Sequence, residues 1–199
     1  TATTEIYTLS RHDALPIFNL AAPLGMRHMA SDPSPAAAED AARLGVELVD
    51  LDALLRSADF LCVCCALTPE TRHLIDAAAL ALMKETAYLV NVARGPIVDQ
   101  AALTRALQSG ALQGAALDVF EEEPISTDDP LLQLDNVILS PHAVSWTDEA
   151  FRLMGQSASK SILDVAAGRD PEHVVNREVL ENPRFRQRLE RYRAMDKEN

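Results

Sequence analysis

Residues 87–119 read AYLVNVARGPIVDQAALTRALQSGALQGAALDV, and this stretch decides the fold. An apolar run at 87–92 is followed by an amphipathic stretch at 99–108 and a second apolar run at 114–119. Continuous apolar runs are typical of strands buried on both faces of a parallel sheet, and the stretch between them has helical periodicity. The order strand, helix, strand predicts two parallel strands joined by a right-handed crossover.

The same alternation continues on both sides of this stretch. Strands are expected at 27–31, 46–49, 59–65 and 136–140, and helices at 35–44, 50–58, 76–83 and 147–167. Gly25 is expected to close an earlier helix, and a charged helical stretch is expected near 183–195. Strands that alternate with helices predict an α/β fold with a doubly wound, Rossmann-like parallel sheet.

Composition excludes several classes of function. The 199 residues carry a formal net charge of −12, which disfavours binding to a phosphate backbone and so to nucleic acid. No apolar run reaches the roughly 18 residues that a membrane span needs, and no signal peptide is recognisable at the start of the sequence. Three clustered cysteines form no disulfide framework, so we expect a reducing compartment, most simply the cytoplasm.

Those cysteines also raise the question of a metal site. Cys62, Cys64 and Cys65 lie in one expected strand, so Cys62 and Cys64 share a face while Cys65 points to the other. A zinc site would need a second pair of ligands. The sequence therefore predicts small buried apolar side chains and no metal.

Three polar side chains follow separate expected strands: Arg94 in NVARG, Glu123 in DVFEEEP and His142 in SPHA. They are 29 and 19 residues apart, about one strand and helix each, so their strand ends can meet at one sheet edge. Guanidinium grips a carboxylate, imidazole transfers protons near neutral pH, and a carboxylate orients an imidazole. This set fits hydride transfer to or from a 2-hydroxy acid. The competing interpretations are a surface ion pair for Arg94, a solvated acidic run for Glu123 and a strand-to-loop corner for His142.

From about Asn19 to Val175 the chain closely resembles the nucleotide-binding half of the D-isomer-specific 2-hydroxyacid dehydrogenases. The phrases that carry the resemblance are LGMRHMASDP, DLDALLRSADFLCVCCALTPETRHLID, MKETAYLVNVARGPIVDQAAL, ALQSGALQGAALDVFEEEP and LDNVILSPHAVSWT. The resemblance implies Arg94 as substrate clamp, His142 as general acid and base, and Glu123 as its partner, because the family's catalytic carboxylate directly precedes a proline.

The resemblance also implies NAD as the cofactor. Asp32, at the end of the second strand of the nucleotide fold, would bond the adenosine ribose and disfavour NADP; otherwise it forms a turn before Pro33. Asp118 would bond the nicotinamide carboxamide; otherwise it caps a loop. The full set of expected cofactor-binding residues is Asp32, Cys65, Thr71, Val92, Ala93, Arg94, Asp118, His142 and Ala143. His12, His28 and His73 are expected to lack partners.

One departure from the family is large. The three glycines of its phosphate-binding loop would fall near Leu9, Arg11 and Ala14, where side chains obstruct the approach of a pyrophosphate and Asp13 repels it. Residues 4–9 have strand propensity and could fill the slot of the first strand in the order 3-2-1-4-5-6. Our hypothesis is that residues 1–18 are a foreign leader.

The expected organisation is therefore a leader at 1–18, a dinucleotide-binding domain at 19–146 and a C-terminal helix and tail at 147–199. That helix would join a substrate domain that this sequence lacks. The expected function is hydride transfer between NAD(H) and C2 of a small 2-hydroxy or 2-keto acid, in a parent that is a homodimer by family analogy. The alternatives are a non-catalytic NAD-sensing or corepressor-like module, an inactive truncated product, and formate or phosphite oxidation on the same fold.

Overall fold

The computed structural model describes the backbone of residues 3–7, 15–35 and 37–196. The chain forms two compact units, Thr1–Val144 and Ser145–Asn199. Leu9, Arg11, Asp13 and Ala14, on which the expectation of a missing phosphate loop depends, lie outside the described residues, as does His12.

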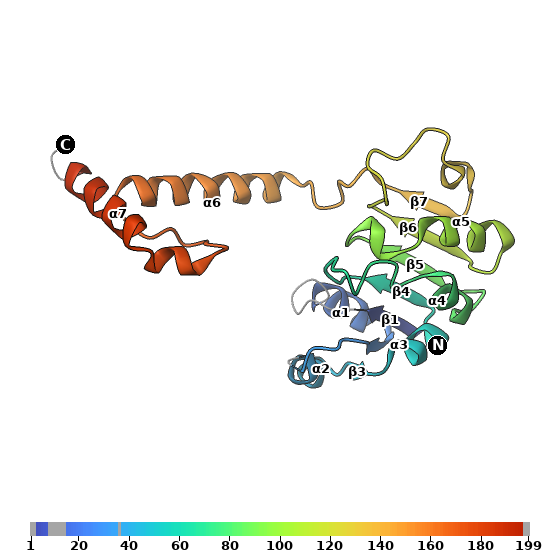
Figure 1. Cartoon of the computed structure of the whole chain (residues 1–199). Helices are drawn as coiled ribbons and strands as arrows, with labels where there is room; N and C mark the ends of the chain where they lie inside the picture. Colours follow the sequence, from blue (N-terminus) through green and yellow to red (C-terminus); the bar gives the residue numbers. More distant parts are fainter. Residues whose placement is uncertain (1–2, 8–14, 36, 197–199) are drawn as a thin grey trace. The chain divides into compact units, whose positions relative to one another are not determined.

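The first unit is built on a seven-stranded sheet in which every strand pair is parallel. The strands are β1 (Thr3–Tyr7), β2 (Arg27–Ala30), β3 (Glu47–Leu48), β4 (Phe60–Val63), β5 (Tyr88–Asn91), β6 (Gly114–Leu117) and β7 (Val137–Leu139). Their order is β3-β2-β1-β4-β5-β6-β7, visible as the row of arrows in Figure 1. The predicted doubly wound parallel sheet is confirmed, and the segment at the start of the chain fills the central first-strand slot.

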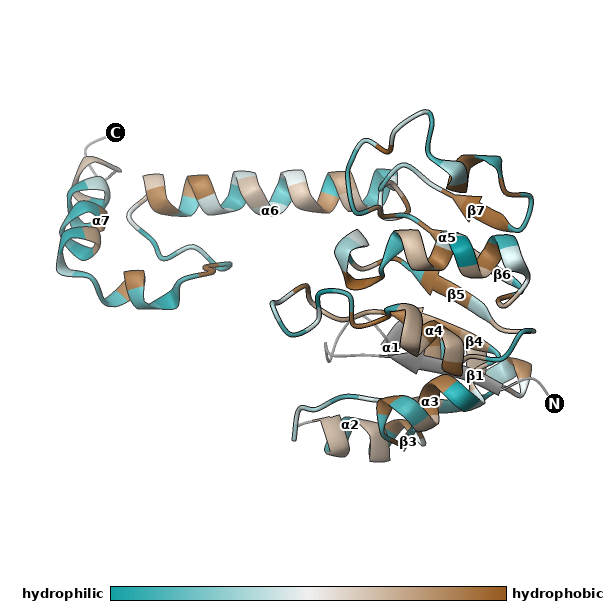
Figure 2. Cartoon of the chain, turned by 45° about the vertical axis from the view of Figure 1, so that its right-hand side comes forward, coloured by the Kyte–Doolittle hydropathy of each residue, from teal (hydrophilic) through white to brown (hydrophobic). Residues whose placement is uncertain are grey.

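Helices cover the two faces of this sheet in the way that right-handed crossovers require. The helices are α1 (Leu15–Ala21), η1 (Ala22–Leu24), α2 (Ala37–Leu44), α3 (Leu51–Ser57), α4 (Ala77–Leu82), η2 (Gly95–Ile97), α5 (Gln100–Ser109) and η3 (Pro130–Gln133). The chain runs from β1 to β3 in one direction across the sheet and from β4 to β7 in the other. The crossover helices of the two halves therefore lie on opposite faces. Helices α3, α4 and α5 line up along one face (Figure 2).

Local sequence explains where the helices of that face begin. Asp50, Asp76 and Asp99 each precede a helix, and the carboxylate of each accepts a hydrogen bond from a backbone N–H in the first turn. A carboxylate in that position satisfies a donor without a helical partner and interacts favourably with the helix dipole. At the other end of α5, Gly110 adopts a left-handed conformation with φ of 74°, as expected for a C-terminal cap.

Two hydrophobic clusters hold the helices to the sheet. The larger cluster packs α3, α4 and α5 against β4, β5 and β6 through fully buried side chains that include Leu54, Leu61 and Leu103. The smaller cluster contains Phe18, Ala41, Cys62 and Cys64. Cys65 belongs to the larger cluster, so the alternation predicted for the three cysteines is confirmed.

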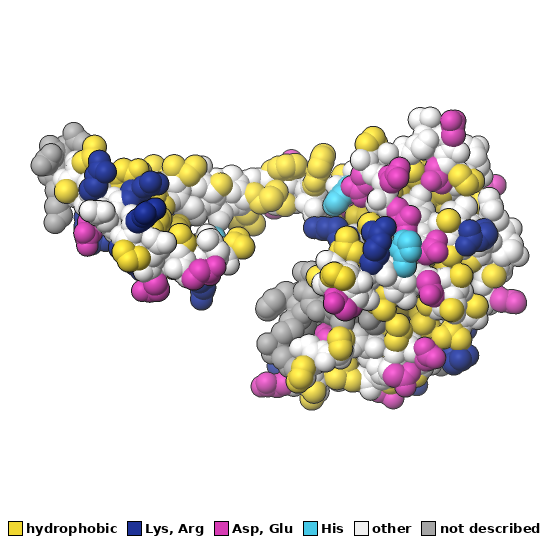
Figure 3. Space-filling model, in the orientation of Figure 1, with side chains coloured by type: hydrophobic (Ala, Val, Ile, Leu, Met, Phe, Trp, Pro, Cys, Tyr) yellow, Lys and Arg dark blue, Asp and Glu magenta, His cyan; other side chains and the backbone are white. Residues whose placement is uncertain are grey.

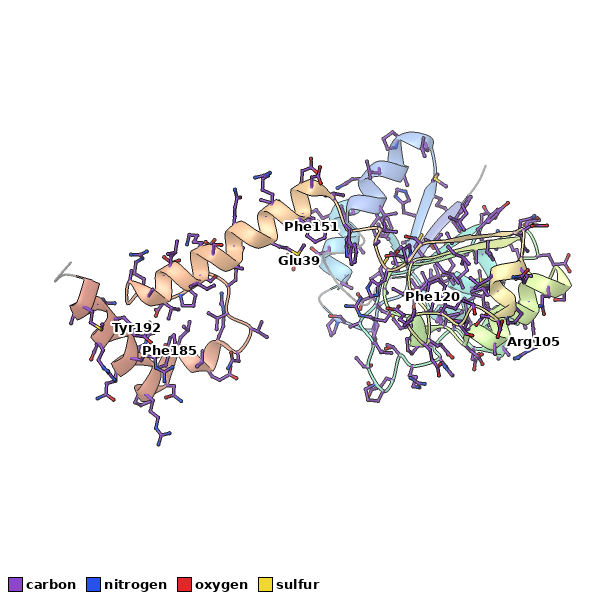
Figure 4. The ribbon with its side chains drawn as sticks, turned by 90° about the horizontal axis from the view of Figure 1, so that it is seen from above. Glu39, Arg105, Phe120, Phe151, Phe185 and Tyr192 are labelled. Carbon is purple, nitrogen blue, oxygen red and sulfur yellow. The ribbon has the colours of Figure 1, made fainter. Side chains whose placement is uncertain are left out.

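The second unit consists of α6 (Asp148–Ala166), η4 (Arg177–Glu181) and α7 (Pro183–Asp196). The buried Asp164 of α6 accepts hydrogen bonds from Lys160 at 2.9 Å and from Arg169 at 3.0 Å. Helix α7, which carries Phe185 and Tyr192, packs against α6 (Figure 4). Hydrophobic side chains line α6 (Figure 3), and several remain more than half exposed, among them Phe151, Leu153, Met154, Ile162 and Leu163.

Candidate active site

The candidate site lies where β5, β6 and β7 end. These strands are in parallel register, with Asn91 opposite Leu117 and Leu117 opposite Leu139. The loops that follow the three strands therefore start side by side at the carboxyl edge of the sheet. Ligands in open α/β sheets bind outside this edge. Figure 3 shows acidic, basic and histidine side chains close together on one face of the sheet unit.

The loop after β5 carries Arg94 and is held from within by Asn91. The Asn91 side chain is buried, its carbonyl oxygen accepts from the Ala93 N–H at 3.1 Å, and its amide donates to the Arg94 carbonyl at 3.1 Å. Arg94 itself is exposed, and its guanidinium donates to the Ala93 carbonyl at 2.6 Å. Asn91 thus fixes the backbone from which an accessible cation extends.

Gly95 lets this loop pack directly on the loop after β6. A Cβ atom at Gly95 would lie 1.8 Å from the carbonyl oxygen of Phe120 and 1.9 Å from its carbonyl carbon. Both obstacles are backbone atoms, which cannot rotate away. Phe120, labelled in Figure 4, is buried in the sheet unit. Only glycine therefore permits this contact, which places the residue after Arg94 against the segment that leads to Glu123.

Glu123 and His142 form a direct pair. The His142 Nδ1 atom lies 2.7 Å from Glu123 Oε2, and the Phe120 N–H donates to Glu123 Oε1 at 3.0 Å. A carboxylate only accepts, so the proton of this bond belongs to Nδ1, and Nε2 is the ring nitrogen left for chemistry. The pairing proposed from the sequence is present in the structure.

The charge of Glu123 is stabilised by its surroundings. The hydrogen bond from His142 lowers the pKa of Glu123, and the Phe120 N–H and the charges of His142 and Arg94 act in the same direction, whereas burial opposes them. The lowered pKa favours the ionised form of Glu123, which is the form that accepts the hydrogen bond from the imidazole.

The loop after β7 holds His142 in an uncommon backbone conformation. Its φ is +56°, in the left-handed region that few residues other than glycine adopt. The buried Asp118 fixes the following residues, because its carboxylate accepts from Ala143 N–H at 2.8 Å and from Val144 N–H at 3.2 Å. Burial raises the pKa of Asp118, but hydrogen bonds from Ser140, Ala143 and Val144 outweigh burial and lower it. These contacts match the loop-capping alternative for Asp118.

A groove of about 540 Å³ adjoins the loop after β5. It is lined by Cys64, Cys65, Ala66, Leu67, Val92, Ala93 and Arg94. Its volume lies in the range typical of small-molecule sites, and its lining is mostly apolar with one cation. Four residues predicted to bind cofactor, Cys65, Val92, Ala93 and Arg94, are thus gathered along one groove. Burial raises the pKa of Cys65 to about 11, so this thiol is neutral.

Two other predicted cofactor residues lie away from this groove lining. Asp32 follows β2 and its carboxylate accepts from the Ser34 N–H at 2.8 Å, which is the turn that the alternative interpretation described. Thr71 is buried; its hydroxyl accepts from the Thr68 N–H and donates to the Ala66 carbonyl, both at 2.7 Å. Thr71 therefore braces the turn after β4. Cofactor contacts for Asp32 and Thr71 stay predictions.

One sequence expectation is wrong. His73 does not lack a partner, because its Nε2 lies 2.5 Å from Glu121 Oε1. The two residues are 48 positions apart, and only the parallel sheet brings their loops together. His28 is buried beside the Phe18 ring, with ring centroids 5.2 Å apart, and its Nε2 has no hydrogen-bond partner among the residues that the structure describes.

The sequence analysis missed Asn91 as a determinant of the site, although Asn91 interrupts an apolar strand. For Gly95, which directly follows the candidate clamp, the sequence suggested a sharp bend of the loop but not its close packing on Phe120. Among the described residues, no group of three or more His, Cys, Asp or Glu side chains could hold a metal ion. None of the described helices is long and apolar enough to cross a membrane.

Comparison with known proteins shows which family this chain resembles in sequence. The family model for the D-isomer specific 2-hydroxyacid dehydrogenase, NAD binding domain, matches residues 15–144. The match starts four residues before Asn19, where the sequence analysis placed the domain boundary.

Within the aligned region, curated relatives are identical to this chain at nearly half of the positions. A glyoxylate reductase from Thermofilum pendens is 48% identical over 135 residues, 68% of this chain and 40% of that protein. A glyoxylate/hydroxypyruvate reductase B from Citrobacter koseri is 45% identical over 137 residues, 69% of this chain and 42% of that protein. The chain thus spans about two fifths of the length of these relatives.

Solved structures agree with this match. The TT0316 protein from Thermus thermophilus superposes with a TM-score of 0.79 at 32% identity, covering 87% of this chain and 54% of that one. The NAD complex of a D-isomer specific 2-hydroxyacid dehydrogenase from Lactobacillus delbrueckii ssp. bulgaricus gives a TM-score of 0.75 at 27% identity, covering 88% of this chain and 56% of that one.

Proposed function

The chain belongs to the D-isomer-specific 2-hydroxyacid dehydrogenase family, and from this premise we propose that, in a protein of its relatives' full length, its site serves NAD-dependent interconversion of a small 2-oxo acid and its 2-hydroxy acid, of D configuration where C2 is chiral. Glyoxylate and hydroxypyruvate are the substrates we favour, because the relatives named above carry them in their names. The observation that carries the proposal is the His142–Glu123 pair, 2.7 Å apart, with Arg94 in the loop after the neighbouring parallel strand β5.

Arg94 would bind the carboxylate of the substrate. A guanidinium forms two parallel hydrogen bonds with a carboxylate and so fixes the direction of the neighbouring C2 carbonyl. Arg94 is exposed at the mouth of the groove, while Asn91 and Gly95 fix its backbone. The substrate would therefore be held with its carbonyl oxygen toward His142.

His142 would move the proton. In reduction, Nε2–H donates to the carbonyl oxygen as C2 gains a hydride; in oxidation, neutral Nε2 takes the hydroxyl proton as C2 loses a hydride. Glu123 keeps the other ring proton on Nδ1 in both directions, so the ring presents the same nitrogen to the substrate.

The groove residues fit the nicotinamide end of the cofactor. Bound NADH would supply the hydride, and the apolar lining from Cys65, Val92 and Ala93 would exclude water from it. Asp32 would accept a hydrogen bond from the adenosine ribose through the carboxylate oxygen that does not bind Ser34. Its negative charge would repel a 2′-phosphate, so we propose NAD in preference to NADP.

Titration of the 199-residue chain with NADH and NADPH in a calorimeter tests cofactor binding directly. We expect NADH to bind more tightly than NADPH, and Asp32→Ala to weaken NADH binding by about tenfold through loss of a charge-assisted hydrogen bond. A matched control is Asp76→Ala, which removes a helix cap on α4 and not a groove residue. No binding at millimolar NADH would refute both the enzyme and the NAD-sensing alternative for this chain.

Reduction of glyoxylate and hydroxypyruvate, followed by NADH absorbance, tests the chemistry. We expect His142→Asn to abolish turnover while NADH binding persists, because asparagine tolerates the left-handed backbone but cannot transfer the proton. Cofactor binding without turnover of any 2-keto acid would instead favour the non-catalytic module.

A further inference from the structure

A second histidine–carboxylate pair lies next to the one assigned to catalysis. His73 comes from the loop after β4 and Glu121 from the loop after β6, and their side chains meet at Nε2 and Oε1. The pair is partly sheltered, with 39% of the His73 side chain and 29% of the Glu121 side chain exposed. The chemistry assigned to Arg94, Glu123 and His142 does not use it.

The backbone of His73 is fixed by the loop that carries Arg94. Its N–H donates to the Pro96 carbonyl at 2.8 Å, and Ile75 continues the contact through an isolated parallel bridge to Val98. His73 has φ of +52°, a conformation that a histidine adopts at some cost. The imidazole is therefore presented to Glu121 from a rigid support, at the expense of backbone strain.

Glu121 is held at a second point as well. Its N–H donates to Gln100 Oε1 at 3.1 Å, and the Gln100 amide donates to Asp129 at 2.8 Å. Glu121 lies two residues before Glu123, and the intervening turn is closed by the bond from Phe120 N–H to Glu123 Oε1. The segment 120–123 is thus tied to its surroundings on both sides of the turn that aims Glu123.

These ties matter because burial does not hold the catalytic pair in place. The side chains of Glu123 and His142 are 37% and 45% exposed, so packing against neighbours does not by itself restrict either side chain to one rotamer. Side chains in such positions keep one geometry only if the backbone beneath them is fixed and neighbouring hydrogen bonds select it.

We propose that His73 is a positioning residue for the catalytic pair: by binding Glu121 it holds segment 120–123 in the conformation that aims the Glu123 carboxylate at His142. The pair joins the loops after β4, β5 and β6 into one support. That this support serves catalysis rests on the proposed function. That His73 and Glu121 hold Glu123 and His142 in place can be measured in the protein without cofactor or substrate.

The test is the long-range ¹H–¹⁵N NMR spectrum of the histidine rings in the free, ¹⁵N-labelled chain, with the His142 signals assigned by their loss in His142→Asn. In the unmodified chain, we expect the His142 ring to be fixed with its proton on Nδ1. In His73→Asn and His73→Gly, we expect its signals to move toward those of a free imidazole. Both replacements tolerate the left-handed backbone and cannot reach Glu121. The Phe120 amide should lose about tenfold of its protection against hydrogen exchange.

Two variants on the carboxylate side complete the design. Glu121→Ala should shift the His142 ring signals as the His73 variants do. Glu121→Gln should keep the His142 signals of the unmodified chain, because its side-chain oxygen still accepts from His73. Lys84→Ala is the matched control, since the Lys84–Asp59 pair has side-chain exposures of 39% and 26% but lies at the opposite edge of the sheet. It should leave His142 unchanged.

Unchanged His142 signals in both His73 variants would overturn the proposal. Global unfolding of these variants and of Glu121→Ala would overturn it too, because the pair would then stabilise the fold as a whole. Absence of NADH binding or turnover would count against the proposed function alone and would leave this result standing.

Discussion

Gly95→Ala is the most direct test of how the site is assembled. The added Cβ would lie 1.8 Å from the Phe120 carbonyl oxygen, and contacts under 3.0 Å are essentially never tolerated, so the two loops must separate by about 1.2 Å. Overpacking against backbone typically costs about 1–3 kcal/mol. For a unit of this size that corresponds to a decrease in Tm of about 4–12 °C. A displacement of about 1 Å between Arg94 and Glu123 would also lower turnover by about 10²-fold.

The assay combines thermal unfolding, followed by circular dichroism, with the His142 ring spectrum of the folded protein. Gly155→Ala is the matched control, because a Cβ there meets no atom within 4 Å and the residue lies inside α6. It should stabilise its helix by about 0.5–1 kcal/mol. The reasoning fails if Gly95→Ala melts at the temperature of the unmodified chain and keeps the His142 signals of the unmodified chain.

Three further predictions concern charges in the sheet unit. Because hydrogen bonding from His142 lowers the pKa of Glu123, the stability contributed by this pair should be present above about pH 4.3 and lost as pH falls through the lowered pKa. An NMR titration of the Glu123 carboxyl with a midpoint at or above about 4.3 would contradict this. Burial lowers the pKa of His28, so the folded protein keeps it neutral while the unfolded chain binds a proton near pH 6.5. The free energy of unfolding should therefore fall as pH drops from about 6.5 through the lowered pKa. Urea titrations at pH 5 and 7 should show a smaller fall in this free energy for His28→Leu than for the unmodified chain. An equal fall in the two proteins would refute the prediction. Asp118→Asn should cost about 1–3 kcal/mol, since the NH2 group that replaces Oδ2 cannot accept from the Val144 N–H, and hydrogen exchange at Val144 should accelerate. Full retention of protection at Val144 would show that the carboxylate does not hold this loop.

Several elements could be predicted because their determinants are local. Apolar runs gave β4, β5 and β6, and aspartates at helix starts gave the beginnings of α3 and α5. Gly25 and Gly110 ended their helices in the left-handed conformation, as expected. The strand expected at 59–65 was too long, since β4 spans Phe60–Val63 and Cys64 and Cys65 lie in the segment that follows it.

The candidate site was predictable only in part. Arg94 and His142 were predicted because each follows a strand and has a side chain suited to a defined step, and Glu123 because the resemblance to the family singles out the glutamate before the proline. The role of Asp118 as a brace for the His142 loop was open, because a carboxylate at a strand end can serve a cofactor or a backbone equally well. His73 was misjudged because its partner is 48 residues away, and nothing in the local pattern marks such a pair.

The sequence alone determined the order of strands and helices, the faces that the cysteines take and the identity of the three candidate catalytic side chains. The first two follow from periodicity and capping, which act over a few residues, whereas the choice of Glu123 among three consecutive glutamates rested on the resemblance to the family. The tertiary structure alone decided that Gly95 must lack a side chain and that Glu121 binds His73. Those outcomes depend on distances between loops that come together only when parallel strands align their carboxyl ends at one edge.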